Sequence, residues 1–179
     1  MNQSIQREAL RTPSIGGVFE IGAEGARQAD DKARRPDSQL ALRTKDARIK
    51  DTDIEDESSW FRNFATFKIV SASARELLAY ESSGNLPSAP GTVNDTCLGI
   101  HSEGWLSDRL QKLRRMHGEL VVSEMFSERK PCAECIQLLK FQPACRGVFV
   151  AFAVSHAGNA SGRKNAGEMA ARLRRAYGL

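Results

Sequence analysis

Two short stretches of the sequence combine side chains that bind metal ions with one that can move a proton. His101 and Glu103 lie in the stretch HSEGWL, and Cys132 and Cys135 lie in PCAECIQLL. All three histidines and all four cysteines lie at or after Cys97, so the potential metal ligands gather in one half of the chain. One imidazole and two thiolates make a three-ligand zinc site, which leaves the fourth tetrahedral position for a water molecule.

An open position of this kind predicts hydrolytic catalysis, because zinc lowers the pKa of a bound water molecule to near neutrality. Glu103 is not needed as a ligand, so its carboxylate is available to take a proton from this water and return it to a substrate. His101, Cys132 and Cys135 are therefore the expected zinc ligands, and Glu103 is the expected catalytic residue.

Both stretches are expected to open helices. Cys132 and Cys135 are three residues apart and follow Pro131, which the first turn of a helix tolerates well. Their thiols therefore project to one side of the helix. The positive end of the helix dipole and the free N–H groups of the first turn favour the thiolate, which is the form that binds zinc.

Glu103 stands at the head of an apolar stripe in the helix expected over residues 101–116. The stripe continues with Leu106, Leu110 and Leu113. A carboxylate on a buried helix face costs free energy unless something compensates its charge, which favours a functional role. The structural alternatives are an exposed Glu103 that complements the helix dipole and a buried His101 that binds no metal.

The wider pattern is typical of a layered α/β fold. Two short strands are expected in residues 65–73 and 75–85, although residues 73–80 also fit a helix capped by Ser73. A helix over 101–116, a strand over 119–127, a helix over 131–141, a continuous apolar strand over 147–154 and a helix over 165–178 follow. Because helices connect the later strands, we expect an α/β sandwich in which these strands are parallel.

Residues 1–58 differ in composition from the rest of the chain. They are polar, with 10 Lys and Arg against 12 Asp and Glu, and we expect a polar linker or a partly disordered arm. Residues 59–179 form the expected domain, and their 16 basic against 10 acidic residues are compatible with a nucleic-acid partner. The sequence shows no apolar run of about 20 residues that would predict a membrane span, and no ordinary signal peptide.

The two stretches match the H-x-E and P-C-x-x-C signature of zinc-dependent nucleobase deaminases, as His101-Ser102-Glu103 and Pro131-Cys132-Ala133-Glu134-Cys135. Over residues 60–179 the chain therefore resembles the cytidine deaminase superfamily, and within it the compact deaminase domains of bacterial toxins. The resemblance implies a three-layer α/β/α sandwich with a mixed sheet of four to five strands. It also implies zinc on the ends of the two motif helices and hydrolytic loss of ammonia from a base. No fifth strand is recognisable after residues 147–154, which departs from the family pattern.

The resemblance also suggests residues that contact the substrate. Asn94 is the candidate for a contact with the sugar or base, with Asn85 as the alternative. The residues expected to stack on a base or to bind phosphate near the zinc motif are Trp105, Phe126, Arg129 and Lys130. Further basic residues that could track a phosphate backbone, or that are simply solvated on helix faces, are Arg114, Arg115, Arg172, Arg174 and Arg175.

We expect the substrate to be cytosine in single-stranded DNA, because a duplex base must first be flipped out at a cost on the order of a few kcal/mol. RNA, double-stranded DNA, adenine and free nucleosides remain alternatives, since SERKPCAEC lacks the aromatic residues that precede this motif in animal polynucleotide editors. The resemblance implies a secreted or delivered toxin or effector that acts in the cytoplasm of a target cell. It implies, in addition, an inhibitory immunity protein as partner, and we expect no membrane partner.

Two other classes of protein fit parts of the pattern. A binding module with a structural zinc site would use Cys97 and His101 together with Cys132 and Cys135, a closed set of four ligands in which Glu103 has no role. A thiol redox protein would use the Cys132 and Cys135 pair alone and would leave His101 and Glu103 unexplained.

Overall fold

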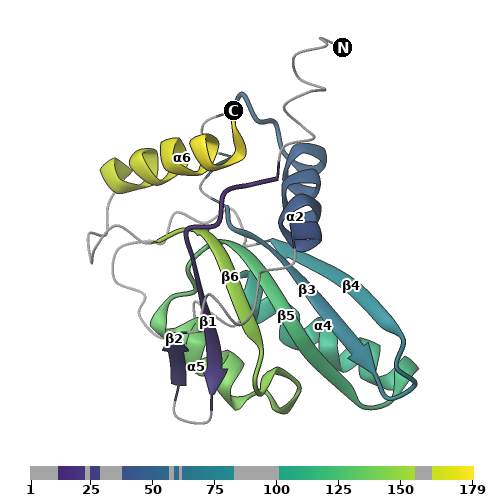
Figure 1. Ribbon diagram of the computed structural model, residues 1–179. Helices are drawn as coiled ribbons and strands as arrows, with labels where there is room; N and C mark the ends of the chain where they lie inside the picture. Colours follow the sequence, from purple (N-terminus) through teal and green to yellow (C-terminus); the bar gives the residue numbers. More distant parts are fainter. Residues whose placement is uncertain are drawn as a thin grey trace.

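The computed structural model describes residues 12–22, 25–28, 38–56, 59–60, 62–82, 101–155 and 163–179 (Figure 1). The strands of this part are β1 (Gly17–Gly22), β2 (Gly25–Gln28), β3 (Phe64–Ser71), β4 (Glu76–Ser82), β5 (Leu120–Arg129) and β6 (Phe149–Val154). Its α-helices are α2 (Ser38–Asp51), α4 (Ser102–His117), α5 (Ala133–Phe141) and α6 (Arg163–Tyr177), and a short 3-10 helix spans Pro143–Cys145. None of the described helices is long and apolar enough to cross a membrane.

The six strands form one mixed sheet in the order β2-β1-β6-β5-β3-β4. β5 and β6 are parallel and are connected through α5, whereas the other neighbouring strands pair in antiparallel fashion. The predicted α/β fold with a mixed sheet is confirmed, and residues 64–82 form the β3–β4 hairpin and not the alternative helix. The predicted number of four to five strands is too low, because β1 and β2 were not expected in the sheet.

The sheet is covered on both faces, and the alternation of side chains along its strands decides which face each residue joins. In β6 all six residues are buried, with Val150 and Phe152 in one apolar cluster and Ala151 and Ala153 in the other. The first cluster includes leucines of α4 and α5, and the second includes residues of α2 and α6. Figure 1 shows α4 and α5 behind the sheet and α2 and α6 on its other side.

The expectation that residues 1–58 are a polar linker is wrong for the described part of this segment. β1 pairs with β6 in antiparallel register, with Gly17 opposite Phe152 and Phe19 opposite Val150. It occupies the sheet position next to β6, where the sequence after residue 154 offers no recognisable strand. Gly17 leaves room for the ring of Phe152, which would have to shift because a Cβ at this position would lie 2.5 Å from it.

Helix α2 was not predicted from the sequence, because its buried face mixes polar residues with Leu40, Ala41 and Ala47. Thr44, Lys45 and Arg48 are fully buried, so the apolar periodicity that predicts an amphipathic helix is weak. Each of these side chains has a partner elsewhere in the domain. The Thr44 hydroxyl donates to the carbonyl oxygen of Leu40 and shares a second hydrogen bond of 2.8 Å with the Thr66 hydroxyl on β3. The Lys45 Nζ donates to the carbonyl oxygen of Tyr177 at the end of α6 at 2.9 Å.

Arg48 forms a buried ion pair with Glu128 near the end of β5, and both side chains have no exposed area. The carboxylate of Glu128 also accepts hydrogen bonds from the Tyr177 hydroxyl at 2.7 Å and from the backbone N–H of Phe64 at 2.9 Å. The guanidinium of Arg48 in turn donates to the carbonyl oxygen of Ser59 at 3.0 Å. This network joins α2, β3, β5 and α6 at a point four residues before the first cysteine of the P-C-x-x-C motif.

Candidate metal centre

The structure brings His101, Cys132 and Cys135 together, although 31 and 34 residues separate the histidine from the two cysteines. The Nδ1 atom of His101 lies 3.0 Å from the Sγ atom of Cys135 and 3.6 Å from the Sγ atom of Cys132. The three potential ligand atoms all lie within 4.8 Å of one another, and this group could hold a metal ion.

Two helix N-termini place these ligands. His101 is the extended residue before the first turn of α4, and Cys132 holds the same position before α5. The thiol of Cys132 caps its helix by accepting the backbone N–H of Cys135 at 3.4 Å. Both helices anchor in the same apolar cluster, α4 through Leu106 and Leu110 and α5 through Leu139, which fixes the two N-termini side by side.

The electrostatics of the group favour a thiolate at Cys132. Hydrogen bonding from Cys135, followed by that from His101, lowers the pKa of Cys132 to about 3 although partial burial opposes the shift. The hydrogen bond to Cys132 raises the pKa of His101, and burial of the ring opposes this. A thiolate is the form of cysteine that binds metal ions, so these contacts preorganise Cys132 as a ligand.

Glu103 lies beside the group and is only 3% exposed. Burial raises the pKa of its carboxyl group, while hydrogen bonds from its own backbone N–H, Cys135 and Ser102 act in the opposite direction. The hydroxyl of Ser102 donates to Oε2 of Glu103 at 3.0 Å. This burial rules out the alternative of an exposed glutamate that only complements the helix dipole.

Asn63, which sequence analysis did not single out, connects the two halves of the centre. Its Nδ2 donates to the hydroxyl of Ser102 at 2.9 Å and to the hydroxyl of Ser127 on β5 at 3.0 Å. Its Oδ1 accepts the backbone N–H of Arg129 at 3.1 Å. Asn63 thus ties the start of α4 to the end of β5, the strand that leads into the cysteine motif. An asparagine before a strand carries no signal of this role in the sequence.

Replacing Asn63 with alanine should weaken metal binding about tenfold, because residues that orient metal ligands typically contribute factors of 10 to 100 in affinity. The affinity can be measured by competition between the protein and a chromophoric chelator, with Zn²⁺ as the probe ion. Ser123→Ala is the control, since Ser123 lies on β5 and, among the described residues, its hydroxyl donates to the carbonyl oxygen of Lys68, away from Ser102 and Ser127. An unchanged dissociation constant for Asn63→Ala would contradict the role of Asn63.

The other residues that were expected to contact a substrate lie in different surroundings or outside the described residues. Trp105 is 42% exposed on α4, and its backbone N–H donates to the carbonyl oxygen of His101, so its backbone lies one helical turn after His101. Lys130 is exposed next to Pro131. Asn94, like its alternative Asn85 and like Cys97, lies outside the described residues.

Two of the expected substrate contacts are not placed for that role. Phe126 is 1% exposed and belongs to the apolar cluster with α2 and α6, so the expectation that it stacks on a base is wrong. The aromatic ring fills the core because β5 is a central strand, covered on both faces. The guanidinium of Arg129 donates to the carbonyl oxygen of Trp60, which directs it to the segment before β3.

Comparison of the chain with protein-family models, with curated proteins and with solved structures found no match. The chemistry of the centre therefore rests on its own residues. These are three potential ligands of one metal ion and, beside them, one buried carboxyl group that is not needed as a ligand.

Proposed function

We propose that this chain is a zinc-dependent hydrolytic deaminase that converts cytosine to uracil in single-stranded DNA. The observation that carries the proposal is the position of Glu103, which is buried against a group of three potential metal ligands without being one of them. An open three-ligand centre with an adjacent carboxyl group is the arrangement that hydrolysis of an amine from a base requires.

The donor set fits zinc. One nitrogen and two sulfurs are ligands that zinc accepts in tetrahedral geometry, with Zn–N about 2.0–2.1 Å and Zn–S about 2.3 Å. In such a tetrahedron a nitrogen and a sulfur lie about 3.5 Å apart. The two distances from His101 Nδ1 to the thiol sulfurs, 3.0 Å and 3.6 Å, are close to this value. Zinc held by His101, Cys132 and Cys135 would supply Lewis acidity that lowers the pKa of water.

Glu103 would carry the protons of the reaction. Water adds to C4 of cytosine and ammonia leaves, so a C–O bond forms, a C–N bond breaks, and protons move from the water to the ring nitrogen and the amine. The raised pKa of Glu103 suits a group that must accept a proton and release it again near neutral pH. The hydrogen bond from Ser102 holds the carboxylate oxygen in place for both transfers.

The choice of substrate rests on charge and accessibility. Residues 59–179 carry 16 basic against 10 acidic residues, which favours a polyanion over a free nucleoside. A base in a single strand reaches a buried centre without the cost of leaving a duplex. Action as a delivered toxin in the target cytoplasm, with an inhibitory immunity protein in the producing cell, is part of the proposal and rests on the motif resemblance.

The proposal is tested by incubating the zinc-loaded protein with a single-stranded DNA oligonucleotide that holds one cytosine. Uracil is then detected by cleavage with uracil-DNA glycosylase. We expect uracil to accumulate catalytically, in excess of the protein. If zinc is bound and no uracil forms, parallel reactions with RNA, duplex DNA, an adenine oligonucleotide and cytidine identify a different substrate, and failure of all of them refutes a deaminase.

The ligand set can be tested separately from activity. We expect Cys132→Ser to lose bound zinc because it removes a thiolate ligand, whereas Cys97→Ser and Cys145→Ser should keep about one zinc per chain. Cys145 is a suitable control, since it is fully buried in the first apolar cluster and burial raises its pKa to about 12. The measurement is metal content by mass spectrometry. Loss of zinc from Cys97→Ser would indicate the closed structural site with four ligands.

A further inference from the structure

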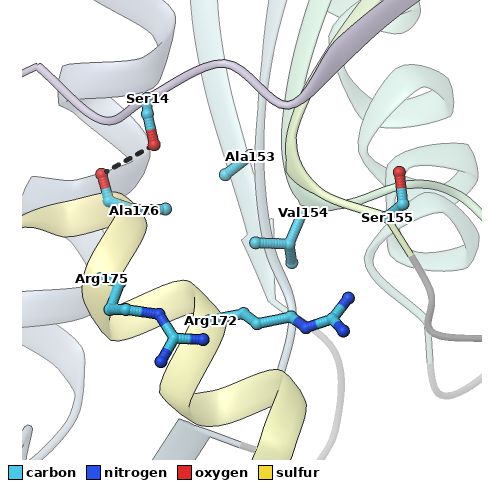
Figure 2. A pocket seen from close by; sticks show the side chains of 7 residues that line it. All are labelled: Ser14, Ala153, Val154, Ser155, Arg172, Arg175 and Ala176. Carbon is cyan, nitrogen blue, oxygen red and sulfur yellow. Dashed lines mark hydrogen bonds between the residues drawn. The ribbon is translucent and has the colours of Figure 1, made fainter.

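A second feature lies at the end of β6, on the side of the sheet that α6 covers. An open pocket of about 390 Å³ is bounded by α6, by the end of β6 and by the segment before β1. Two guanidinium groups and two hydroxyl groups line it, from Arg172, Arg175, Ser14 and Ser155 (Figure 2). The apolar part of the lining consists of Ala153, Val154 and Ala176.

The pocket and the metal centre share one edge of the sheet. β5 and β6 are the parallel pair, so both end at this edge, and Arg129 lies opposite Val154 in their register. One residue further, the backbone N–H of Lys130 donates to the carbonyl oxygen of Val154 at 2.9 Å. Val154 therefore lines the pocket while its neighbour strand, about 4.8 Å away, leads directly into Pro131 and Cys132. Ligands of α/β proteins commonly bind at the carboxyl ends of parallel strands.

The lining of the pocket fits an anion. Arg175 is exposed, and Arg172 pairs with Glu168 at 2.5 Å through side chains that are 40% and 51% exposed. An ion pair in such contact with solvent is weak, so Arg172 can exchange its carboxylate partner for another anion. The guanidinium fork matches the geometry of phosphate oxygens. The hydroxyl of Ser155 adds a donor, whereas that of Ser14 donates to the carbonyl oxygen of Ala176 at 3.4 Å (Figure 2). Among the described residues that line the pocket, none carries a carboxylate.

The three arginines at the end of α6 differ in what they do. Arg174 donates to the carbonyl oxygen of Ile54 and lies over the ring of Trp60, 5.2 Å from its centroid, so it holds α6 to the segment before β3. Arg172 and Arg175, one helical turn apart, instead reach the pocket, as Figure 2 shows. The segment before β1 closes the opposite side, where the backbone N–H of Ser14 donates to the carbonyl oxygen of Ala176 at 2.9 Å.

We propose that this pocket binds a backbone phosphate of the nucleic-acid strand whose target base occupies the metal centre. The inference rests on the proposed function for the identity of the ligand. An open, cationic pocket suits a segment of a chain more than an enclosed small molecule. Lys130, exposed between the pocket and Cys132, continues the positive charge along the path from one to the other. Arg172 and Arg175 thus select a polynucleotide over a free nucleoside.

The first test measures binding to a fluorescent oligothymidine, which holds no cytosine and cannot be deaminated. The variant Arg172→Gln/Arg175→Gln should bind about tenfold more weakly at low salt. The slope of log affinity against log salt should fall by about 0.7, since each phosphate of a single strand that the protein neutralises contributes about 0.7. The matched control is Arg114→Gln/Arg115→Gln, which removes the same charge from the far end of α4. Equal losses in the two variants would overturn the proposal, because net charge alone would then explain binding.

A second test uses the carboxylate that competes with the phosphate. Glu168→Gln should tighten oligothymidine binding about twofold to threefold, whereas Glu119→Gln, which frees Arg114 from a more exposed ion pair, should leave binding unchanged. Looser or unchanged binding by Glu168→Gln would contradict competition at Arg172.

A third test separates this inference from the proposed function. In Arg172→Gln/Arg175→Gln the KM for a cytosine oligonucleotide should rise about tenfold, while deamination of cytidine should be unaffected. If no base is deaminated by the wild-type protein, the proposed function fails, yet the oligothymidine experiment still decides whether the pocket binds nucleic acid. An equal loss of cytidine deamination would instead place the arginines in a structural role and overturn the proposal.

Discussion

Glu103→Gln should lower the rate of uracil formation by about 10²–10⁴-fold while the protein keeps its zinc. Glutamine has nearly the same shape, and it can still accept the hydrogen bond from Ser102, but it cannot take a proton from water. General acid–base catalysis contributes rate factors of this size, so an end-point assay should detect no uracil from Glu103→Gln. Single-turnover formation of uracil and metal content by mass spectrometry, made on the same sample, check the two halves of the prediction.

The same substitution should not lower the free energy of unfolding. Burial disfavours the charged form of Glu103, and it is the first cause of the raised pKa of this carboxyl group. A neutral amide avoids the cost of burying that charge, so loss of activity would not reflect unfolding. Glu119→Gln, in the turn between the C-terminal end of α4 and β5, is the control and should retain full activity. Activity of Glu103→Gln within a few-fold of the wild type would show that Glu103 does not carry the proton.

The second large effect concerns stability and lies in the buried network of α2. Arg48→Met should reduce the free energy of unfolding by about 3–5 kcal/mol, because it leaves the carboxylate of Glu128 buried without its cation. The Tyr177 hydroxyl and the Phe64 N–H would still bond to Glu128, but neither carries a charge. Urea denaturation followed by circular dichroism measures the change.

A double substitution distinguishes the uncompensated charge from lost packing. Arg48→Met/Glu128→Gln removes the charge that Arg48→Met leaves behind, so the double variant should be more stable than Arg48→Met alone. Lys68→Met is the matched control, since Lys68 pairs with Glu76 at 3.1 Å through partly exposed side chains and should cost less than about 1 kcal/mol. An Arg48→Met variant as stable as this control would show that the buried pair does not anchor α2.

The candidate metal centre could be located from the sequence because its parts are local. His101 and Glu103 are two residues apart, and the cysteines are separated by one helical turn, so the geometry within each motif follows from helix formation alone. The leucines of α4 and α5 then predict that each motif helix packs its apolar face into the core of the domain. In the structure both helices contribute leucines to the same apolar cluster. The elements from β3 to α6 were predictable for the same reason, since their patterns alternate or repeat within one element.

The positions of β1 and α2 could not be predicted, because polarity was taken as a sign of exposure. Arg48 and Lys45 are buried only because partners far along the chain receive them. Arg48 meets Glu128 80 residues later, and Lys45 meets the carbonyl oxygen of Tyr177 132 residues later. The residues next to Arg48 and Lys45 in the sequence do not indicate where such partners lie. β1 is likewise defined by its antiparallel pairing with β6, a strand more than 125 residues later in the chain, and this pairing could not be read from the sequence of β1.

The support of the centre also depends on contacts over long sequence separations. Asn63 reaches Ser102 after 39 residues and Ser127 after 64, and neither contact leaves a periodic signal in the sequence. For Phe126 the local sequence was misleading. An aromatic residue near the cysteine motif suggested stacking on a base, but both faces of the sheet are covered and the ring of Phe126 lies in the core. The positions of the candidate ligands and of Glu103 within their helices thus follow from local spacing. Their orientation depends on which distant segments fold against them, since side chains acquire these contacts only when the sheet assembles.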